Sequence, residues 1–101
     1  MIALPCTVRL EVPADHPVRD GHFPQQPLLP GALLIDLLLL AIDAGAEAGW
    51  RVVSAKFPGA AIPGDVLLVQ AARDGGGDIA CTITSGARTV LDARLRPPEG
   101  A

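Results

Sequence analysis

The sequence predicts an α+β fold in which a curved antiparallel sheet wraps around one long central helix. Gly31–Ala48 has the length of a helix and is apolar on nearly every side, one strand-like segment precedes it, and four follow it with short connections. Successive strands with short connections pair antiparallel. A helix that is apolar all round has to be covered all round. The 101 residues suit one domain, 1–101, with a limited core. A second subunit is therefore the natural cover for the side of the helix that the sheet leaves open.

The first element is a strand followed by a stiff loop. Apolar and polar residues alternate from Cys6 to Val12, which indicates a half-buried strand. Pro13 ends this strand. The segment Asp15–Pro30 carries prolines at positions 17, 24, 27 and 30, and these favour a rigid loop over a helix.

The central element is the helix Gly31–Ala48, which Gly49 closes. Pro30 stands at its entrance, where a missing amide hydrogen costs little. Its first three turns are apolar except for Asp36, so we expect them to be buried on all sides.

The remaining strands and turns follow in order. The predicted strands are Val52–Phe57, Val66–Arg73, Ile79–Ser85 and Thr89–Arg96. The predicted turns are Gly59–Gly64, Asp74–Asp78 and the position of Gly86.

Composition excludes several classes of function. The formal net charge is -3 and aromatic residues make up 3% of the chain, which argues against a nucleic-acid partner. Cys6 and Cys81 do not form a disulfide framework and are expected to be small buried hydrophobes. The longest apolar segment, Ala32–Ile42, is well short of the roughly 20 residues of a membrane span. With no signal peptide at its start, the chain is expected to be soluble and cytoplasmic.

Three features can carry chemistry. Asp36 interrupts an apolar run, and a buried carboxylate must find partners, either in a nearby loop or in a functional site. His22 lies in the proline-rich loop, which limits its freedom. The amides of Gly31 and Ala32 begin the helix, where they have no intrahelical partner and the dipole favours negative charge. Together they supply a base, an acid and an oxyanion donor, as elimination beside a thioester carbonyl requires. Asp15, His16, Asp20 and His22 could instead hold a metal, but without any standard ligand spacing.

The loop and helix resemble a known family. The stretch Gly-His-Phe-Pro-x-x-Pro-x-x-Pro-Gly at positions 21–31, followed by an apolar helix with an acid, resembles the 3-hydroxyacyl-acyl-carrier-protein dehydratases of bacterial fatty-acid synthesis. The spacing from His22 to Asp36 agrees with that family. Lys56-Phe57 and then Pro63-Gly64-Asp65 are similar to the strand, turn and strand that follow the family's helix.

The resemblance implies a hotdog fold and a dimer whose active sites are shared across the interface. It implies that His22 is the catalytic histidine and Asp36 the catalytic acid. Gly31 corresponds to the glycine whose amide polarises the thioester carbonyl, and the carbonyl of Leu28 to the group that holds the histidine ring. The substrate-binding set implied by the resemblance is Gly31, Leu28, Phe23, Pro30 and Ala32.

The activity implied is dehydration of 3-hydroxyacyl thioesters to trans-2-enoyl thioesters, with no metal or organic cofactor. The substrate would arrive on the phosphopantetheine arm of an acyl carrier protein. The short chain is most similar to the compact dehydratases of fatty-acid, polyketide or aryl-polyene-type biosynthesis. Its assembly partner would be a second copy or another hotdog subunit. Two alternatives stay open: a non-catalytic hotdog subunit that supports an active partner, and a hotdog acyl thioesterase. Thioesterases usually lack the histidine-proline loop, so the second ranks lower.

Two positions depart from the family, and one face of the last strand is basic. Gln25 stands where the family usually has glycine. Leu40 stands where many members carry a glutamine that would hydrogen-bond the acid, and its presence favours the non-catalytic alternative. Because carrier proteins of this type are acidic, Arg88, Arg94 and Arg96 are expected to form a docking patch, or else an ordinary solvated strand face.

Overall fold

The computed structural model describes residues 1–14, 28–44 and 48–99. Within these ranges lie strand β1, helix α2 and strands β2 to β5, in that order along the chain. Their bounds are Cys6–Glu11 for β1, Gly31–Ala41 for α2, Arg51–Lys56 for β2, Val66–Arg73 for β3, Ile79–Ser85 for β4 and Arg88–Arg96 for β5.

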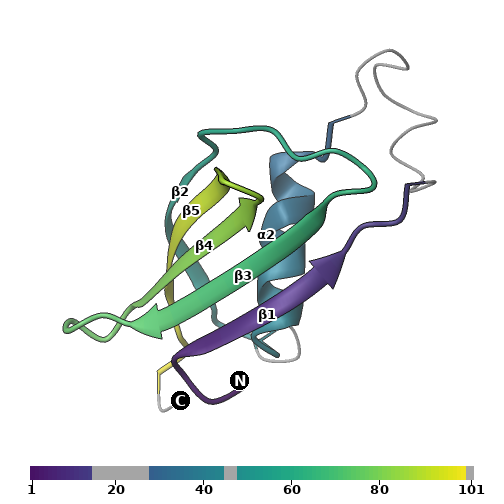
Figure 1. Ribbon diagram of the computed structural model, residues 1–101. Helices are drawn as coiled ribbons and strands as arrows, with labels where there is room; N and C mark the ends of the chain where they lie inside the picture. The colour runs from purple at the N-terminus through teal and green to yellow at the C-terminus, as the bar shows by residue number, and fades with distance from the viewer. Residues whose placement is uncertain (15–27, 45–47, 100–101) are drawn as a thin grey trace.

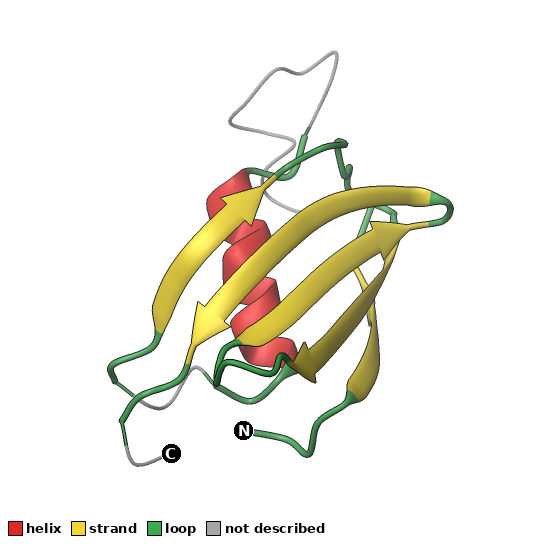
Figure 2. Ribbon diagram, turned by 90° about the vertical axis from the view of Figure 1, so that its left-hand side faces the viewer, coloured by secondary structure: helices red, strands yellow, loops and turns green. Residues whose placement is uncertain are grey.

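The strands form one curved antiparallel sheet of order β1-β3-β4-β5-β2, and α2 lies against one of its faces (Figures 1 and 2). The predicted α+β fold is therefore confirmed. Short hairpin connections join β3 to β4 and β4 to β5, while β1 and β2 occupy the two edges. Among the described residues, no helix is long and apolar enough to cross a membrane.

The core lies between the sheet and α2, because every second residue of β3 and β4 points toward the helix. Leu67, Val69 and Ala71 of β3 are buried, while Val66 and Leu68 between them are exposed. The helix contributes one buried row to the same cluster, Leu34, Leu38 and Ile42. This alternation fixes the register of β3, because a slip by one residue would turn its apolar set outward.

The helix is shorter than the sequence predicts, since it ends at Ala41 and not at Ala48. Asp43 adopts the left-handed conformation with φ 57°. Its amide donates to the Leu40 carbonyl at 3.1 Å, and the amide of Ala44 donates to the Leu39 carbonyl at 2.9 Å. These two bonds satisfy the last carbonyls of the helix and turn the chain away. An aspartate can adopt this conformation where glycine is the usual choice, and for that reason the stop was missed.

The helix is also buried on one side only, which corrects the expectation of burial all round. The row Leu34, Leu38 and Ile42 is buried against the sheet. The row Ala32, Asp36 and Leu40 is exposed, and Leu40 keeps 70% of its surface accessible. A single sheet covers one side of a helix, so the apolar composition of the other side needs a different cover. We call Ala32, Asp36 and Leu40 the exposed stripe.

Two ion pairs tie the β3–β4 connection to strand β5. Arg94 pairs with Asp74, and Arg96 donates from Nε and Nη2 to the two carboxylate oxygens of Asp78 at 2.9 and 3.2 Å. Asp74 in turn accepts the amides of Gly76 and Asp78. The hydrogen bonds from Arg96 hold the pKa of Asp78 below its ordinary value of 3.8.

Replacing Arg96 with glutamine is expected to lower the melting temperature at neutral pH, and the loss should disappear in acid. A carboxyl with a lowered folded pKa stabilises the fold above its ordinary pKa, and this stabilisation is lost as the pH falls through the folded value. Circular dichroism melts of both proteins from pH 7 downward measure it. Arg88→Gln is the matched control, because Arg88 lies 3.7 Å from the Asp65 carboxylate, too far for a hydrogen bond. A difference for Arg96→Gln that persists unchanged at low pH would exclude the pair as its source.

Candidate active site

The chain enters the helix through an extended segment that is anchored to the connection between β2 and β3. Leu29 is buried, and its amide donates to the Ala61 carbonyl at 2.8 Å. Pro30 is extended, with φ −61° and ψ 148°, and its carbonyl accepts the amides of Leu33 and Leu34. The helix therefore begins at Gly31, as the sequence predicts.

The first amides of the helix are free to bind a ligand. Among the described residues, the amides of Gly31 and Ala32 have no hydrogen-bond acceptor. Free amides at a helix start, together with the helix dipole, favour a negatively charged or strongly polarised oxygen. Leu28, whose carbonyl has a role implied by the resemblance, is 41% exposed.

Phe57 lies directly against the helix start, although its residue type and position in the sequence predict no separate role for it. A Cβ added at Gly31 would come 2.8 Å from Cζ and 2.9 Å from Cε1 of the Phe57 ring. Any residue larger than glycine would therefore displace the ring. Phe57 follows the end of β2 and remains 47% exposed, so its ring forms one wall beside the free amides. In the sequence, the Lys56-Phe57 pair contributes to the family resemblance, but it does not indicate that Phe57 contacts Gly31.

The turn before β3 is fixed by its own hydrogen bonds and by one to the end of β1. Gly64 has φ 95°, a conformation that glycine adopts without strain. Its amide donates to the Val12 carbonyl at 2.9 Å, and the amide of Ile62 donates to the Asp65 carboxylate at 3.0 Å. This explains the residues Pro63-Gly64-Asp65: the glycine makes the turn and the aspartate closes it.

Asp36 lies on the exposed stripe, one helical turn beyond Ala32. This corrects the expectation that its carboxylate is buried in apolar surroundings. Among the described residues it has no hydrogen-bond or ion-pair partner. His22 and Phe23 lie outside the described residues, as does the alternative metal set of Asp15, His16, Asp20 and His22. The described part of the site is thus open, with free amides at one end and a carboxylate one turn away.

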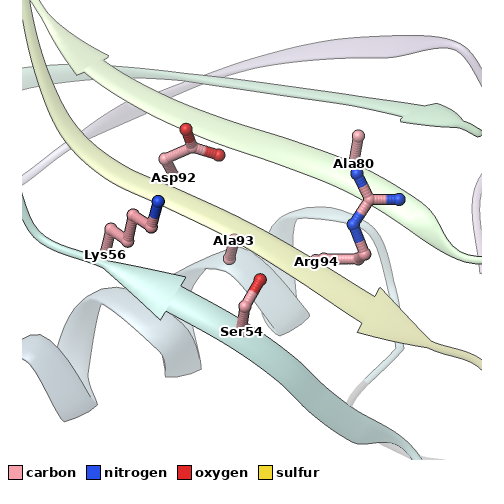
Figure 3. Close-up of a pocket in the computed structure, with 6 residues that line it drawn as sticks. All are labelled: Ser54, Lys56, Ala80, Asp92, Ala93 and Arg94. Atoms are coloured by element: carbon pink, nitrogen blue, oxygen red, sulfur yellow. The ribbon is translucent and has the colours of Figure 1, made fainter.

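The hollows on the surface lie elsewhere. One hollow of about 220 Å³ is lined by Ser54, Lys56, Ala80, Asp92, Ala93 and Arg94, with α2 on the other side of the sheet (Figure 3). It contains none of the predicted catalytic or substrate-binding residues, although Arg94 of the predicted docking patch lines it. The helix start is the better candidate site, because its free amides can bind a polarised oxygen and Asp36 can exchange a proton.

The basic patch predicted on β5 is largely neutralised. Arg88, Arg94 and Arg96 each stand within ion-pair distance of an aspartate, namely Asp65, Asp74 and Asp78. Within the described ranges, the cations without such a partner are Arg51, Lys56 and Arg73. Any attraction of an acidic carrier protein by this strand is therefore weakened.

The described residues offer no other reactive group of note. Burial raises the pKa of the Cys81 thiol to about 12, so it is protonated and inert at neutral pH. Residues 1–14, 28–44 and 48–99 hold no cluster of three histidine, cysteine, aspartate or glutamate side chains that could bind a metal.

Comparison with known proteins places this arrangement in a family. The model of the ApeI-like family, described as ApeI dehydratase, matches residues 4–91. The chain is similar to the 3-hydroxyacyl-[acyl-carrier-protein] dehydratase FabZ of Granulibacter bethesdensis, with 38% identity over 65 residues. That match covers 52% of this chain and 38% of the relative, so the chain spans less than half of that protein's length.

Solved structures give the same fold. The dehydratase heterocomplex ApeI:P from Xenorhabdus doucetiae matches with a TM-score of 0.69 and 25% identity, over 89% of this chain and 83% of that one. The fluoroacetyl-CoA-specific thioesterase FlK matches with a TM-score of 0.61 and 17% identity, over 90% and 86%, and shows the fold alone. The sheet, the helix and these neighbours together are those of the hotdog fold. The chain belongs to the ApeI-like dehydratase family.

Proposed function

We propose that the chain dehydrates 3-hydroxyacyl thioesters carried by an acyl carrier protein in the cytoplasm, giving trans-2-enoyl thioesters and water. One observation carries the proposal. The free amides of Gly31 and Ala32 begin α2, and the carboxylate of Asp36 lies one turn beyond Ala32 on the exposed stripe. Membership of the ApeI-like family supports it.

In the proposed reaction, His22 removes the proton from the carbon next to the thioester carbonyl. The amide of Gly31 donates to the thioester oxygen, on which negative charge develops. Asp36, directly or through a water, gives a proton to the 3-hydroxyl, which leaves as water. The carbonyl of Leu28 orients the histidine ring, and Phe23, Pro30 and Ala32 contact the substrate. The proton taken by His22 and the proton given by Asp36 balance, so the protein returns to its starting state after exchange with water.

The proposed site requires a second hotdog subunit. The exposed stripe and the wall formed by Phe57 are open to solvent, and an elimination of this kind works best where water is excluded. One similar solved structure is a dehydratase heterocomplex, ApeI:P, which supports an assembly of this type.

One alternative has an observation in its favour. Leu40 lies one turn beyond Asp36 on the exposed stripe and offers no hydrogen bond to the carboxylate. A non-catalytic subunit that supports an active partner would need no such bond. A thioesterase is favoured by nothing beyond the shared fold.

The proposal is tested with a 3-hydroxyacyl thioester on a carrier protein, with products separated by mass spectrometry. The proposed activity gives the enoyl thioester, whose mass is lower than that of the substrate by one molecule of water, as elimination requires. Release of the free acid would identify a thioesterase. No reaction by the chain in any assembly, including one with a second hotdog subunit, would identify a supporting subunit.

Replacing Leu40 with glutamine is expected to raise turnover while leaving stability unchanged. Residues four apart on a helix are neighbours, so the new amide can donate to the Asp36 carboxylate. Because Leu40 is 70% exposed, the substitution removes no core contact. The rate at saturating substrate and the melting temperature measure the two effects. Leu68→Gln, at an exposed leucine on the outer face of β3, is the control that makes the same change away from Asp36. An equal rate gain from both substitutions would contradict the pairing.

A further inference from the structure

Two hollows meet on the outer face of the sheet, which is the face turned away from α2. The hollow of about 220 Å³ described above lies over β4, β5 and β2 (Figure 3). A second hollow of about 250 Å³ lies over β1, β3 and β4, and its lining includes Thr7, Gln70, Ala72, Ala80 and Thr82. Ala80 lines both hollows, so they join into one depression across the strands. We call this depression the outer trough, the first hollow its charged end and the second its apolar end.

The strand registers place the two ends of the outer trough in one row. Ala72 of β3 stands opposite Ala80 of β4. Arg94 of β5 stands between Ala80 and Ser54 of β2. These four residues are exposed, and residues paired directly across strands share a face of the sheet. The alanines therefore form a low floor that leads from the charged end into the apolar end.

The charged end gathers hydrogen-bond donors from two strands. Lys56 and Ser54 project from β2 and Arg94 from β5 (Figure 3). Among the described residues, Lys56 has no ion-pair partner, and Arg94 gives only its Nη1 to Asp74. The ammonium of Lys56, the hydroxyl of Ser54 and the remaining N–H groups of Arg94 are thus available to an acceptor. A carboxylate accepts about four hydrogen bonds, so one carboxylate can take all three donors.

Asp92 limits the charge that this end accepts. It lines the same hollow and stands opposite Lys56 in the strand register. Its carboxylate repels an anion, and the repulsion grows with the charge of that anion. A phosphate monoester carries about two negative charges at neutral pH. A carboxylate, with one charge, therefore fits the charged end better.

The apolar end suits an uncharged chain. None of the described residues that line it carries a charge, and its floor is formed by Ala72 and Ala80. Four strand spacings separate β2 from β1 in the sheet, and each spacing is about 4.8 Å, so the outer trough is roughly 19 Å long. A long, flexible apolar chain can lie along this length while its head stays among the donors.

We propose that the outer trough binds a free fatty acid. Its carboxylate lies among Lys56, Ser54 and Arg94, and its acyl chain runs over Ala80 toward β1. A thioester of the same chain is neutral at this position and offers no charge to Lys56, so the outer trough selects the free acid. The trough lies on the opposite face of the sheet from α2, so the inference is independent of the proposed function.

Titration of the whole chain with butyrate, octanoate and decanoate tests the site. Backbone amide chemical shifts measure each affinity and locate the ligand. Each added methylene should tighten binding by up to about fourfold, the limit for full burial. Decylamine and decanol have the same chain without the negative head, so they should bind more weakly than decanoate. Decyl phosphate should also bind more weakly, because of Asp92.

Charge variants test the head-group contacts. Lys56→Gln should weaken decanoate by about three- to fivefold, as loss of an exposed ion pair does. Asp92→Asn should tighten decanoate and reduce its advantage over decyl phosphate, a gain that mere damage to the fold would not produce. Arg73→Gln is the matched control, because Arg73 is another exposed cation without a described partner and lines neither hollow. It should leave the affinity unchanged.

A filled floor tests the path of the acyl chain. Ala80→Leu places a larger side chain where the two hollows meet, and decanoate binding should be lost while butyrate binding changes little. Thr84→Leu is the control on the same face of β4, since Thr84 stands opposite the exposed Leu68 and lines neither hollow. Circular dichroism melts show whether each variant folds, and the charge variants decide the question if Ala80→Leu does not.

The single lysine of the chain allows an independent readout. Decanoate should slow acetylation of Lys56 while the amino terminus reacts as before, which peptide mass spectrometry measures. The proposal is overturned if decylamine binds as tightly as decanoate, or if Lys56→Gln and Arg73→Gln have equal effects. It is also overturned if Ala80→Leu folds and keeps full affinity, or if rising protein concentration alone protects Lys56, which would mean that a second copy covers this face. Selective binding by a chain that dehydrates no thioester would reject the proposed function alone.

Discussion

Replacing His22 with alanine, or Asp36 with asparagine, is expected to lower the rate of dehydration by about 10²–10⁴-fold, the usual contribution of a positioned acid or base. The assay is enoyl formation from a 3-hydroxyacyl-pantetheine thioester by the assembled protein. Asp36→Asn keeps the size of the side chain and removes the proton that the leaving hydroxyl needs. Because Asp36 lies on the exposed stripe, the fold of the chain does not depend on it.

Asp43→Asn is the matched control for this test. It makes the same chemical change at an exposed aspartate just past the end of α2, and asparagine tolerates the positive φ found there. We expect it to retain full activity and a wild-type melting temperature. If Asp36→Asn is as active as Asp43→Asn, the carboxylate takes no part in the reaction.

Replacing Leu38 with alanine is expected to lower the free energy of unfolding by about 2–5 kcal/mol, the range for a buried leucine that leaves a cavity. Leu38 is fully buried at the centre of the row that α2 packs against the sheet. For a domain of this size, such a loss is a large part of the total stability. Urea denaturation followed by circular dichroism measures it.

Leu40→Ala removes the same atoms from the same helix, two residues away. Since Leu40 is 70% exposed, we expect the unfolding free energy of the isolated chain to stay within about 0.5 kcal/mol of wild type. Its cost should instead be seen in the affinity for the second subunit, because the exposed stripe is proposed to be covered there. Equal destabilisation of the isolated chain by both substitutions would mean that both sides of α2 are already packed.

Much of the fold could be predicted from local patterns. The alternation in β1, β3 and β4 gave strands whose bounds differ little from those of the structure, because each has one buried and one exposed face. The start of α2 was predicted at Gly31, since Pro30 and Gly31 mark it chemically. Its end was not, because Asp43 makes the stop that glycine usually makes. The place of β2 beside β5 was not predicted, because pairing partners depend on contacts distant in sequence.

The site was predicted in its residue types and only partly in its surroundings. Ala32 and Asp36 do share one side of the helix, as their spacing of four residues requires, and Gly31 stands at its start. The burial of Asp36 was predicted wrongly, because an apolar helix indicates cover without saying which chain provides it. Phe57 was missed as a neighbour of Gly31, since a contact between residues so far apart depends on the packing of β2 beside the helix. The roles of His22 and Phe23 stay predictions.

The order of strands in the sheet has a consequence for how the protein folds. Strands β3, β4 and β5 form a meander whose contacts are local in the chain, and local contacts form fastest. The edge strands come from the segments on either side of α2, so they join this meander only after long loops have closed. The helix that carries the candidate chemistry therefore docks late, onto a scaffold whose nucleus contains none of its residues. Changes to the row of α2 that is buried against the sheet, such as Leu38→Ala, should therefore raise the unfolding rate while leaving the folding rate nearly constant.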